Sequence, residues 1–229
     1  MNGGGLLGRG RAALNPMILI AVLLLGWPRQ LGAEQTREGK LSIGVSGLQH
    51  TLDAIRFGDL RPAQHSDFGG RAELLYSVVP EFSVVLAGHR ARSHFHYDTG
   101  FEKGNWRDSD WGVELGPDLH LARMGGTRLS IGGSAFYGEA RSRLSIANPG
   151  IGSAEFDGPT TFLVGGRGVM TVSHSLLSRL EGAVQLGCGL YKARARAVPS
   201  GNLYEWNGRS VTVTAGLRFI VIPRRDVGP

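Results

Sequence analysis

Apolar and polar residues alternate along most of the chain beyond residue 34, with a period of two. In the last such segment, Val211, Val213 and Leu217 fall on one face, while Thr212 and Arg218 fall on the other. Successive side chains of a β-strand point to opposite faces, so this alternation predicts strands with one apolar and one polar face. We place eight of them, at residues 40–48, 67–79, 82–97, 110–122, 128–146, 160–174, 179–191 and 210–223.

Two of these segments change the parity of their apolar residues partway along. The change falls between Leu86 and Ala91 in segment 82–97, and near Gly138 in segment 128–146. A β-bulge inserts one extra residue and shifts the alternation by one position. We therefore expect a bulge at each place, and the alternative is that one of the strands is misplaced.

The connections between the segments alternate in length. Short ones fall at residues 79–81, 125–127 and 175–177, and long ones at roughly 55–66, 98–109, 147–158 and 199–209. The long connections contain turn and loop formers such as Asn148-Pro149-Gly150. Short turns on one side and long loops on the other predict an all-β fold, an eight-stranded antiparallel up-and-down transmembrane β-barrel.

The N-terminal segment has the features of a secretory signal peptide. Arg9 and Arg11 precede an apolar run at residues 17–25, and Leu31-Gly32-Ala33 offers small residues for cleavage. The run is too short for a helix that crosses a bilayer, which needs roughly 20 residues, although an uncleaved anchor is the alternative. We expect residues 1–33 to be a signal peptide and residues 34–229 to form the barrel domain.

Charge and composition indicate where such a barrel resides. Removing residues 1–33 removes three arginines and no acid, so the formal net charge falls from +6 to +3 and gives little support to nucleic-acid binding. The polar face is rich in Gly, Ser and Thr, whereas a soluble surface usually carries many Lys and Glu. We therefore expect the apolar face to meet lipid in the bacterial outer membrane. A soluble periplasmic or secreted lipocalin-like barrel, apolar inside, is the alternative.

The exported chain, its alternating segments and the Leu217-Arg218-Phe219 sequence near its end resemble the small outer-membrane β-barrel proteins of the OmpA/OmpX type. The resemblance covers residues 40–223 and is architectural. It implies insertion by the barrel-assembly machinery, with outer-membrane lipid and lipopolysaccharide as partners. Such proteins often end on an aromatic residue, and this chain departs from that pattern because Ile220 to Pro229 follow Phe219.

Charged residues on the polar face are expected inside the barrel. Side chains fill the lumen of so narrow a barrel, and a buried charge is costly unless it is paired. The predicted lumen charge network consists of Arg71, Glu73, Glu114, Arg167, Arg179, Glu181 and Arg218. These residues favour a plug of Arg–Glu pairs, with a small gated pore as the alternative.

No residue set in the strands assembles a convincing active site. His94 and His96 have strand spacing for a metal, but apart from Asp98 no third ligand is near, and the His-x-Ser arrangement of barrel lipid A deacylases is absent. We predict a non-enzymatic protein, without metal or cofactor, that serves envelope structure or surface interaction; a lipid-A-modifying enzyme is the alternative. An unidentified extracellular ligand would meet the loop residues Phe101, Lys103, Trp106, Phe156, Tyr204 and Trp206.

Overall fold

The computed structural model describes residues 39–52, 65–98, 103–148, 150, 152–158, 160–196 and 203–222. They form nine strands: β1 (Lys40–Leu52), β2 (His65–Val79), β3 (Phe82–Asp98), β4 (Lys103–Met124), β5 (Thr127–Asn148), β6 (Gly152–Asp157), β7 (Thr161–Leu177), β8 (Leu180–Arg196) and β9 (Leu203–Ile222). The predicted signal peptide, residues 1–33, lies outside the described residues. Within the described ranges, no helix is long and apolar enough to cross a membrane.

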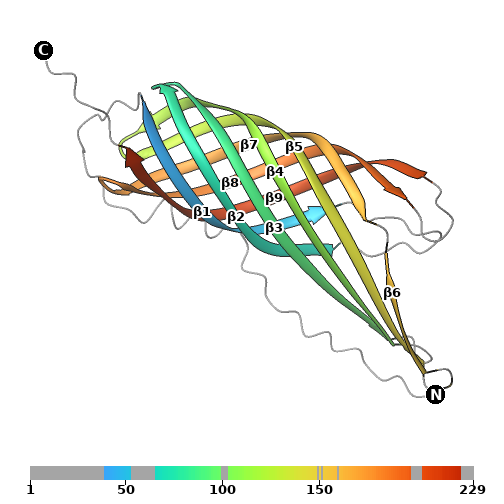
Figure 1. The fold of residues 1–229 in the computed structure, drawn as a ribbon. Helices are drawn as coiled ribbons and strands as arrows, with labels where there is room; N and C mark the ends of the chain where they lie inside the picture. Colours follow the sequence, from blue (N-terminus) through green and yellow to red (C-terminus); the bar gives the residue numbers. More distant parts are fainter. Residues whose placement is uncertain are drawn as a thin grey trace, which may run out of the picture.

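Eight of the strands close into a ring. Each pairs antiparallel with its neighbours in the order β4-β3-β2-β1-β9-β8-β7-β5, and a further pairing of β4 with β5 completes the circle. The predicted eight-stranded antiparallel barrel is therefore confirmed. Strand β6 lies outside the ring and pairs only with residues 143–148 at the outer end of β5, where Figure 1 shows β3, β4 and β5 running on beyond the other strands.

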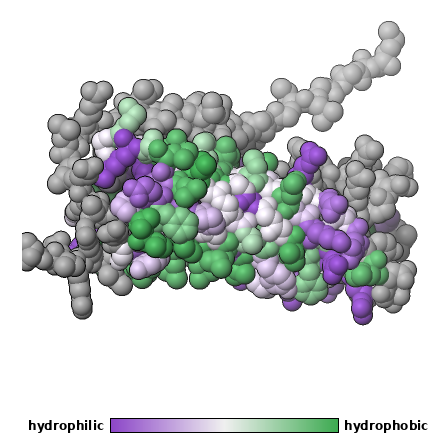
Figure 2. All heavy atoms as spheres, turned by 90° about the horizontal axis from the view of Figure 1, so that it is seen from above, coloured by the Kyte–Doolittle hydropathy of each residue, from purple (hydrophilic) through white to green (hydrophobic). Residues whose placement is uncertain are grey.

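The barrel is apolar outside and charged inside. Large apolar side chains such as Leu115, Val164 and Phe219 are exposed on the outer wall, while Arg218 and Glu114 are only 2% exposed in the lumen. Figure 2 shows the apolar side chains gathered in a band between more polar ends. A soluble barrel would need the reverse arrangement, so the lipocalin-like alternative is wrong. A closed ring with an apolar outer band is the form in which strands cross a bilayer, and the chain is an outer-membrane barrel.

The bulges predicted in two strands are absent. The pairing of β3 with β2 and β4 runs without a shift past Leu86 and Ala91, and that of β5 runs without a shift past Gly138. The parity of the apolar residues changes because the surroundings change along the strand. Ala91 and Phe136 are apolar residues that point into the lumen.

Strands extend into three of the predicted long loops, and most of the fourth, 55–66, lies outside the described residues. Strands β3 and β4 pair as far as Asp98 and Lys103, so most of the predicted loop 98–109 is a hairpin. Likewise β6 occupies half of the predicted loop 147–158, and β9 begins at Leu203. The turn between β7 and β8 lies at residues 178–179, not at 175–177.

Candidate functional site

Glu114 is the centre of the lumen charge network. It accepts a hydrogen bond from Arg71 Nη1 at 2.7 Å and another from Arg167 Nη2 at 2.5 Å. Strand β4 contributes Glu114, while β2 and β7 contribute the two arginines, so the contacts bridge strands that are not neighbours. Arg167 also donates to Thr212 Oγ1 at 3.1 Å. The acid thus meets two cations in a buried site, where charge-assisted hydrogen bonds are strong.

A second cluster lies beside the first. Glu73 on β2 accepts a hydrogen bond from Arg218 Nε on β9 at 2.5 Å and another from Gln185 Nε2 at 3.3 Å. Gln185 in turn accepts a hydrogen bond from Thr214 at 3.1 Å. Arg71 Nε lies 3.6 Å from Glu73, so Arg71 joins the two clusters. The structure thus brings together five predicted lumen residues, namely Arg71, Glu73, Glu114, Arg167 and Arg218.

The two remaining predicted lumen charges behave differently. Glu181 is buried near the short turns, where Arg128 Nη2 lies 3.5 Å from its carboxylate. Arg179 was predicted in the lumen, and this is wrong, because it is exposed in the turn between β7 and β8. The turn lies two residues later than predicted, so Arg179 precedes the strand.

Glycines make room for the large side chains of the lumen. A Cβ at Gly112 would lie 2.6 Å from Cε1 of His89, and one at Gly187 would lie 2.8 Å from Cδ of Arg167. Both distances are shorter than real Cβ contacts. A side chain at either position would have to displace its bulky neighbour, so glycine here lets the two large side chains lie against the strand.

Toward the long-loop end of the lumen, strands β1, β3 and β4 bring two histidines and an aspartate together. His89 Nε2 lies 3.2 Å from Asp110 Oδ2, and His50 Nδ1 lies 3.5 Å from the same oxygen. All three side chains are at most 6% exposed. His89 Nδ1 faces Glu114 Oε1 at 3.4 Å, which connects this cluster to the charge network.

The opposite wall of the outer lumen is apolar. Phe136, Leu163 and Tyr191 form a buried cluster with Ala140 and Ala193, and Trp206 packs against it. The rings of Phe136 and Tyr191 meet edge to face, with centroids 6.3 Å apart. Trp206, which was predicted as an extracellular contact residue, packs with this cluster, and its role in contacts stays a prediction.

The other predicted contact residues lie in or beside the extended hairpins. Lys103 is exposed at the start of β4, and Phe156 is exposed in β6. Trp106 and Tyr204 lie in β4 and β9 and not in the predicted loops, and their role in contacts stays a prediction. Phe101 lies outside the described residues.

The part of β3, β4 and β5 beyond the apolar band carries a basic outer face. Arg92 on β3 is in register with Ser109 on β4 and Arg141 on β5, and in the next row His94 is in register with Arg107 and Arg143. We call Arg90, Arg92, Arg107, Arg141 and Arg143 the arginine face. All five are exposed.

Two of these arginines have acidic partners. Arg141 Nε lies 2.7 Å from Glu139, and Arg143 Nε lies 2.7 Å from Asp157 on β6. The contact with Asp157 raises the pKa of Arg143. Among the described residues, no ion pair joins an acid to Arg90, Arg92 or Arg107, so the face has an excess of positive charge.

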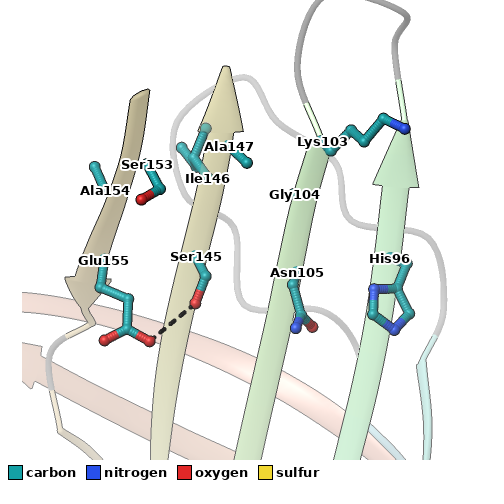
Figure 3. Close-up of a pocket in the computed structure, with 10 residues that line it drawn as sticks. All are labelled: His96, Lys103, Gly104, Asn105, Ser145, Ile146, Ala147, Ser153, Ala154 and Glu155. Atoms are coloured by element: carbon teal, nitrogen blue, oxygen red, sulfur yellow. Dashed lines mark hydrogen bonds between the residues drawn. The ribbon is translucent and has the colours of Figure 1, made fainter. Parts of the chain in front are cut away.

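A shallow hollow lies at the far end of this extension. Its polar lining includes His96, Asn105, Ser145 and Glu155, which stand in register across β3, β4, β5 and β6. Figure 3 shows the hydrogen bond from Ser145 to Glu155, which measures 3.2 Å. The neighbouring His94 hydrogen-bonds Asn105. Together these groups make a polar surface at the tip of the extension.

An exposed ion cluster stands at the outer ends of β8 and β9. Lys192 Nζ and Arg194 Nε lie 2.7 Å and 2.6 Å from the two oxygens of Glu205. The hydrogen bond from Lys192 is the main cause that lowers the pKa of Glu205. This cluster lies beyond the apolar band, at the same end of the barrel as the arginine face but on other strands.

The serine–histidine contact at the short-turn end has the wrong geometry for nucleophilic catalysis. Ser83 Oγ lies 3.3 Å from His120 Nε2, and Asp118 lies 3.7 Å from the same nitrogen. In a catalytic triad the acid bonds the other ring nitrogen, Nδ1, which here faces the carbonyl of Pro80. Ser83 is also fully buried. At the outer rim, His94 hydrogen-bonds Asn105 and Glu139 pairs with Arg141.

Sequence reasoning missed several lumen residues. Arg128 stands at the start of a predicted strand, and its polar parity was a usable signal for a lumen charge. His50 lies beyond the predicted end of the first strand, so its facing direction was not assigned. The meeting of His50 and His89 with Asp110 depends on the stagger of the strands around the ring, which alternation does not contain.

No protein-family model matches the sequence, and no curated protein matches it. Several solved structures have a similar course of the backbone. Ail, the attachment invasion locus protein of Yersinia pestis, is 13% identical with a TM-score of 0.45, and the match covers 80% of this chain and 99% of Ail. Neisserial surface protein A is 14% identical with a TM-score of 0.43, covering 80% and 99%. The chain is also similar to the outer membrane protein OprG from Pseudomonas aeruginosa, at 10% identity and a TM-score of 0.48, covering 81% and 97%.

Proposed function

We propose that this protein is a non-enzymatic outer-membrane barrel that is closed to solutes and interacts with anionic groups at the cell surface through the arginine face. The observation that carries the proposal is the projection of β3, β4 and β5 beyond the apolar band, with five exposed arginines on its outer wall. A sheet held rigid by continuous pairing presents those side chains in fixed rows.

The lumen supports a closed barrel. Arg71, Glu114 and Arg167 meet across it, and the apolar cluster around Phe136 fills the other wall. Opening a water path would require breaking buried ion pairs, which is costly. The lumen is therefore a plug, and recognition takes place on the outside.

The height of the arginine face on the wall indicates its partner. Trp111, which is in register with Arg90, and Tyr137 are exposed at the edge of the arginine face nearest the apolar band, with ring centroids 6.2 Å apart. Aromatic residues of this kind mark the interface between lipid and water. Cations directly above that level face the headgroups of the outer leaflet. Lipopolysaccharide carries phosphates there, and arginine binds phosphate through paired hydrogen bonds.

The proposal is tested with the double variant Arg92→Glu/Arg107→Glu in detergent-solubilised protein, measuring the binding of purified lipopolysaccharide by titration calorimetry. A basic residue near an anionic surface contributes about 1 kcal/mol, and reversing two of them should weaken binding at least tenfold. The matched control is Arg123→Glu/Arg179→Glu, the same charge change at two exposed arginines near the short turns. Equal binding by both double variants would refute the arginine face as the binding surface.

A further inference from the structure

We propose that His50, His89 and Asp110 form a binding site for a divalent transition-metal ion, such as Zn²⁺, inside the lumen. The proposal is independent of lipopolysaccharide binding, because the three residues are buried inside the barrel and the arginine face lies outside it. Two neutral imidazoles and one carboxylate are a donor set that suits zinc and similar ions, whereas Mg²⁺ and Ca²⁺ prefer oxygen ligands alone.

The distances fit a metal centre. In a tetrahedral site with metal–ligand bonds near 2.0–2.1 Å, the ligand atoms stand about 3.3 Å apart. Asp110 Oδ2 lies 3.2 Å from His89 Nε2 and 3.5 Å from His50 Nδ1. One ligand atom from each of the three residues lies within 4.8 Å of the others. Modest adjustment of the side chains would bring all three into one coordination sphere.

Unsatisfied atoms at the same place point to a missing ligand. His50 Nδ1 and Asp110 Oδ1 are buried and have no hydrogen-bond partner. A buried polar atom without a partner is costly, so native proteins rarely keep one without a reason. A cation between the side chains would satisfy His50 Nδ1 directly and Asp110 through its carboxylate.

The local charge also calls for a cation. Asp67 stands opposite His50 across the β1–β2 pair, is 5% exposed, and has an oxygen, Oδ1, without a hydrogen-bond partner. Asp67 and Asp110 together place two carboxylates in this part of the lumen. A divalent ion bound between the histidines and Asp110 would bring positive charge next to both carboxylates.

The surroundings of His89 match those of a metal-binding histidine. A ligating imidazole usually donates its other ring N–H to a carboxylate, which fixes the ring and its tautomer. His89 directs Nε2 toward Asp110 and Nδ1 toward Glu114, 3.4 Å away. Glycine at position 112 gives the ring the space to lie there. The charge network would thus hold a ligand in place.

The test measures Zn²⁺ binding to the full chain, folded in detergent and freed of metal with a chelator. Metal content after dialysis and competition with a chromophoric chelator give the stoichiometry and affinity. Wild-type protein should bind one equivalent, and Asp110→Asn and His50→Gln should each weaken that binding at least tenfold. Co²⁺ bound at the site should show the visible absorption of a four-coordinate ion.

The matched control is the double variant His94→Gln/His96→Gln. These histidines are exposed on the outside, with ring centroids 4.4 Å apart, and could bind metal at the surface. The control should retain the equivalent of Zn²⁺ that the lumen variants lose. Heat-modifiable migration in gels verifies that each variant is folded. Absence of binding in wild-type protein, unchanged affinity in the folded lumen variants, or loss of binding in the control would each overturn the proposal. If the wild type binds Zn²⁺ but Asp110→Asn does not fold, the affinity of His50→Gln decides whether the proposal holds.

Discussion

Replacing Glu114 by Gln tests the energetics of the lumen most directly. The substitution keeps the shape of the side chain and removes its charge. Arg167 then loses the acid that it contacts at 2.5 Å, and Arg71 loses its 2.7 Å partner and keeps only Glu73, at 3.6 Å. Removing one partner of a buried ion pair costs about 3–5 kcal/mol, because the other charge is left without compensation.

The matched control is Glu139→Gln, the same change in an exposed pair. Glu139 contacts Arg141 at 2.7 Å, and the side chain of Arg141 is 71% exposed. Exposed ion pairs contribute about 0–1 kcal/mol, so this variant should unfold almost like the wild type. The two variants therefore compare contacts of similar length in different surroundings.

The free energy of unfolding is measured by urea titration of protein folded in lipid vesicles, followed by tryptophan fluorescence. We expect Glu114→Gln to lose about 3 kcal/mol or more relative to Glu139→Gln. Adding Arg167→Met to Glu114→Gln should recover part of the loss, since the stranded cation is removed. If Glu114→Gln and Glu139→Gln are equally stable, water reaches the lumen charges and the plug is refuted.

The remaining predictions concern the wall, the outer lumen, the rim and conductance. Leu115→Arg should lower the free energy of unfolding in vesicles by about 2–4 kcal/mol because it places a charge in the lipid-facing band. Leu203→Arg, at the outer end of β9, should lower it by only about 0–1 kcal/mol, and equal losses would contradict the placement of the band. Trp206→Ala should cost about 3 kcal/mol, and Trp206→Phe much less, because the indole Nε1 has no hydrogen-bond partner, as urea titration would show. Lys192→Met should raise the pKa of Glu205 toward its ordinary range in an NMR titration, and an unmoved pKa would contradict the contact. Because the pKa is lowered in the folded protein, the pair stabilises the fold at pH values above the ordinary pKa of a glutamate, and that stabilisation is lost as the pH falls through the folded pKa. Wild-type protein in planar bilayers should show no stable ion conductance, and large conductance would favour a pore.

Alternation alone was enough to predict most of the barrel. In β9, Val211, Leu217 and Phe219 are exposed as predicted, and Thr212 and Arg218 are buried. The prediction of which face a residue occupies failed where it used the residue type alone and ignored the position of the residue along the barrel axis. Phe136 points into the lumen because the outer lumen has an apolar cluster, and the arginines of β5 point outward because that part of the wall is above the lipid.

The contacts within the candidate site were less predictable than the facing of its residues. The polar parity of Glu114 and Arg167 places both in the lumen, but their contact joins β4 to β7 across β5. Which residues meet across a lumen depends on the stagger of the strands, and that quantity is fixed by closure of the whole ring. For the same reason the cluster of His50, His89 and Asp110 follows from the three-dimensional structure alone.

The ion pair between Glu73 and Arg218 has a consequence for assembly. The two residues are 145 positions apart in sequence, on β2 and β9, and β1 lies between their strands. Until β9 pairs with β1, each charge lacks its partner, so an unclosed sheet that enters lipid would carry an exposed arginine and glutamate with it. Pairing of β9 with β1 and neutralisation of Glu73 in the β1–β2 hairpin are thus a single event. A chain cut short before Arg218 would leave Glu73 with only the more distant Arg71, 3.6 Å away, as a cationic partner, and should fail to complete insertion, however well its earlier strands pair.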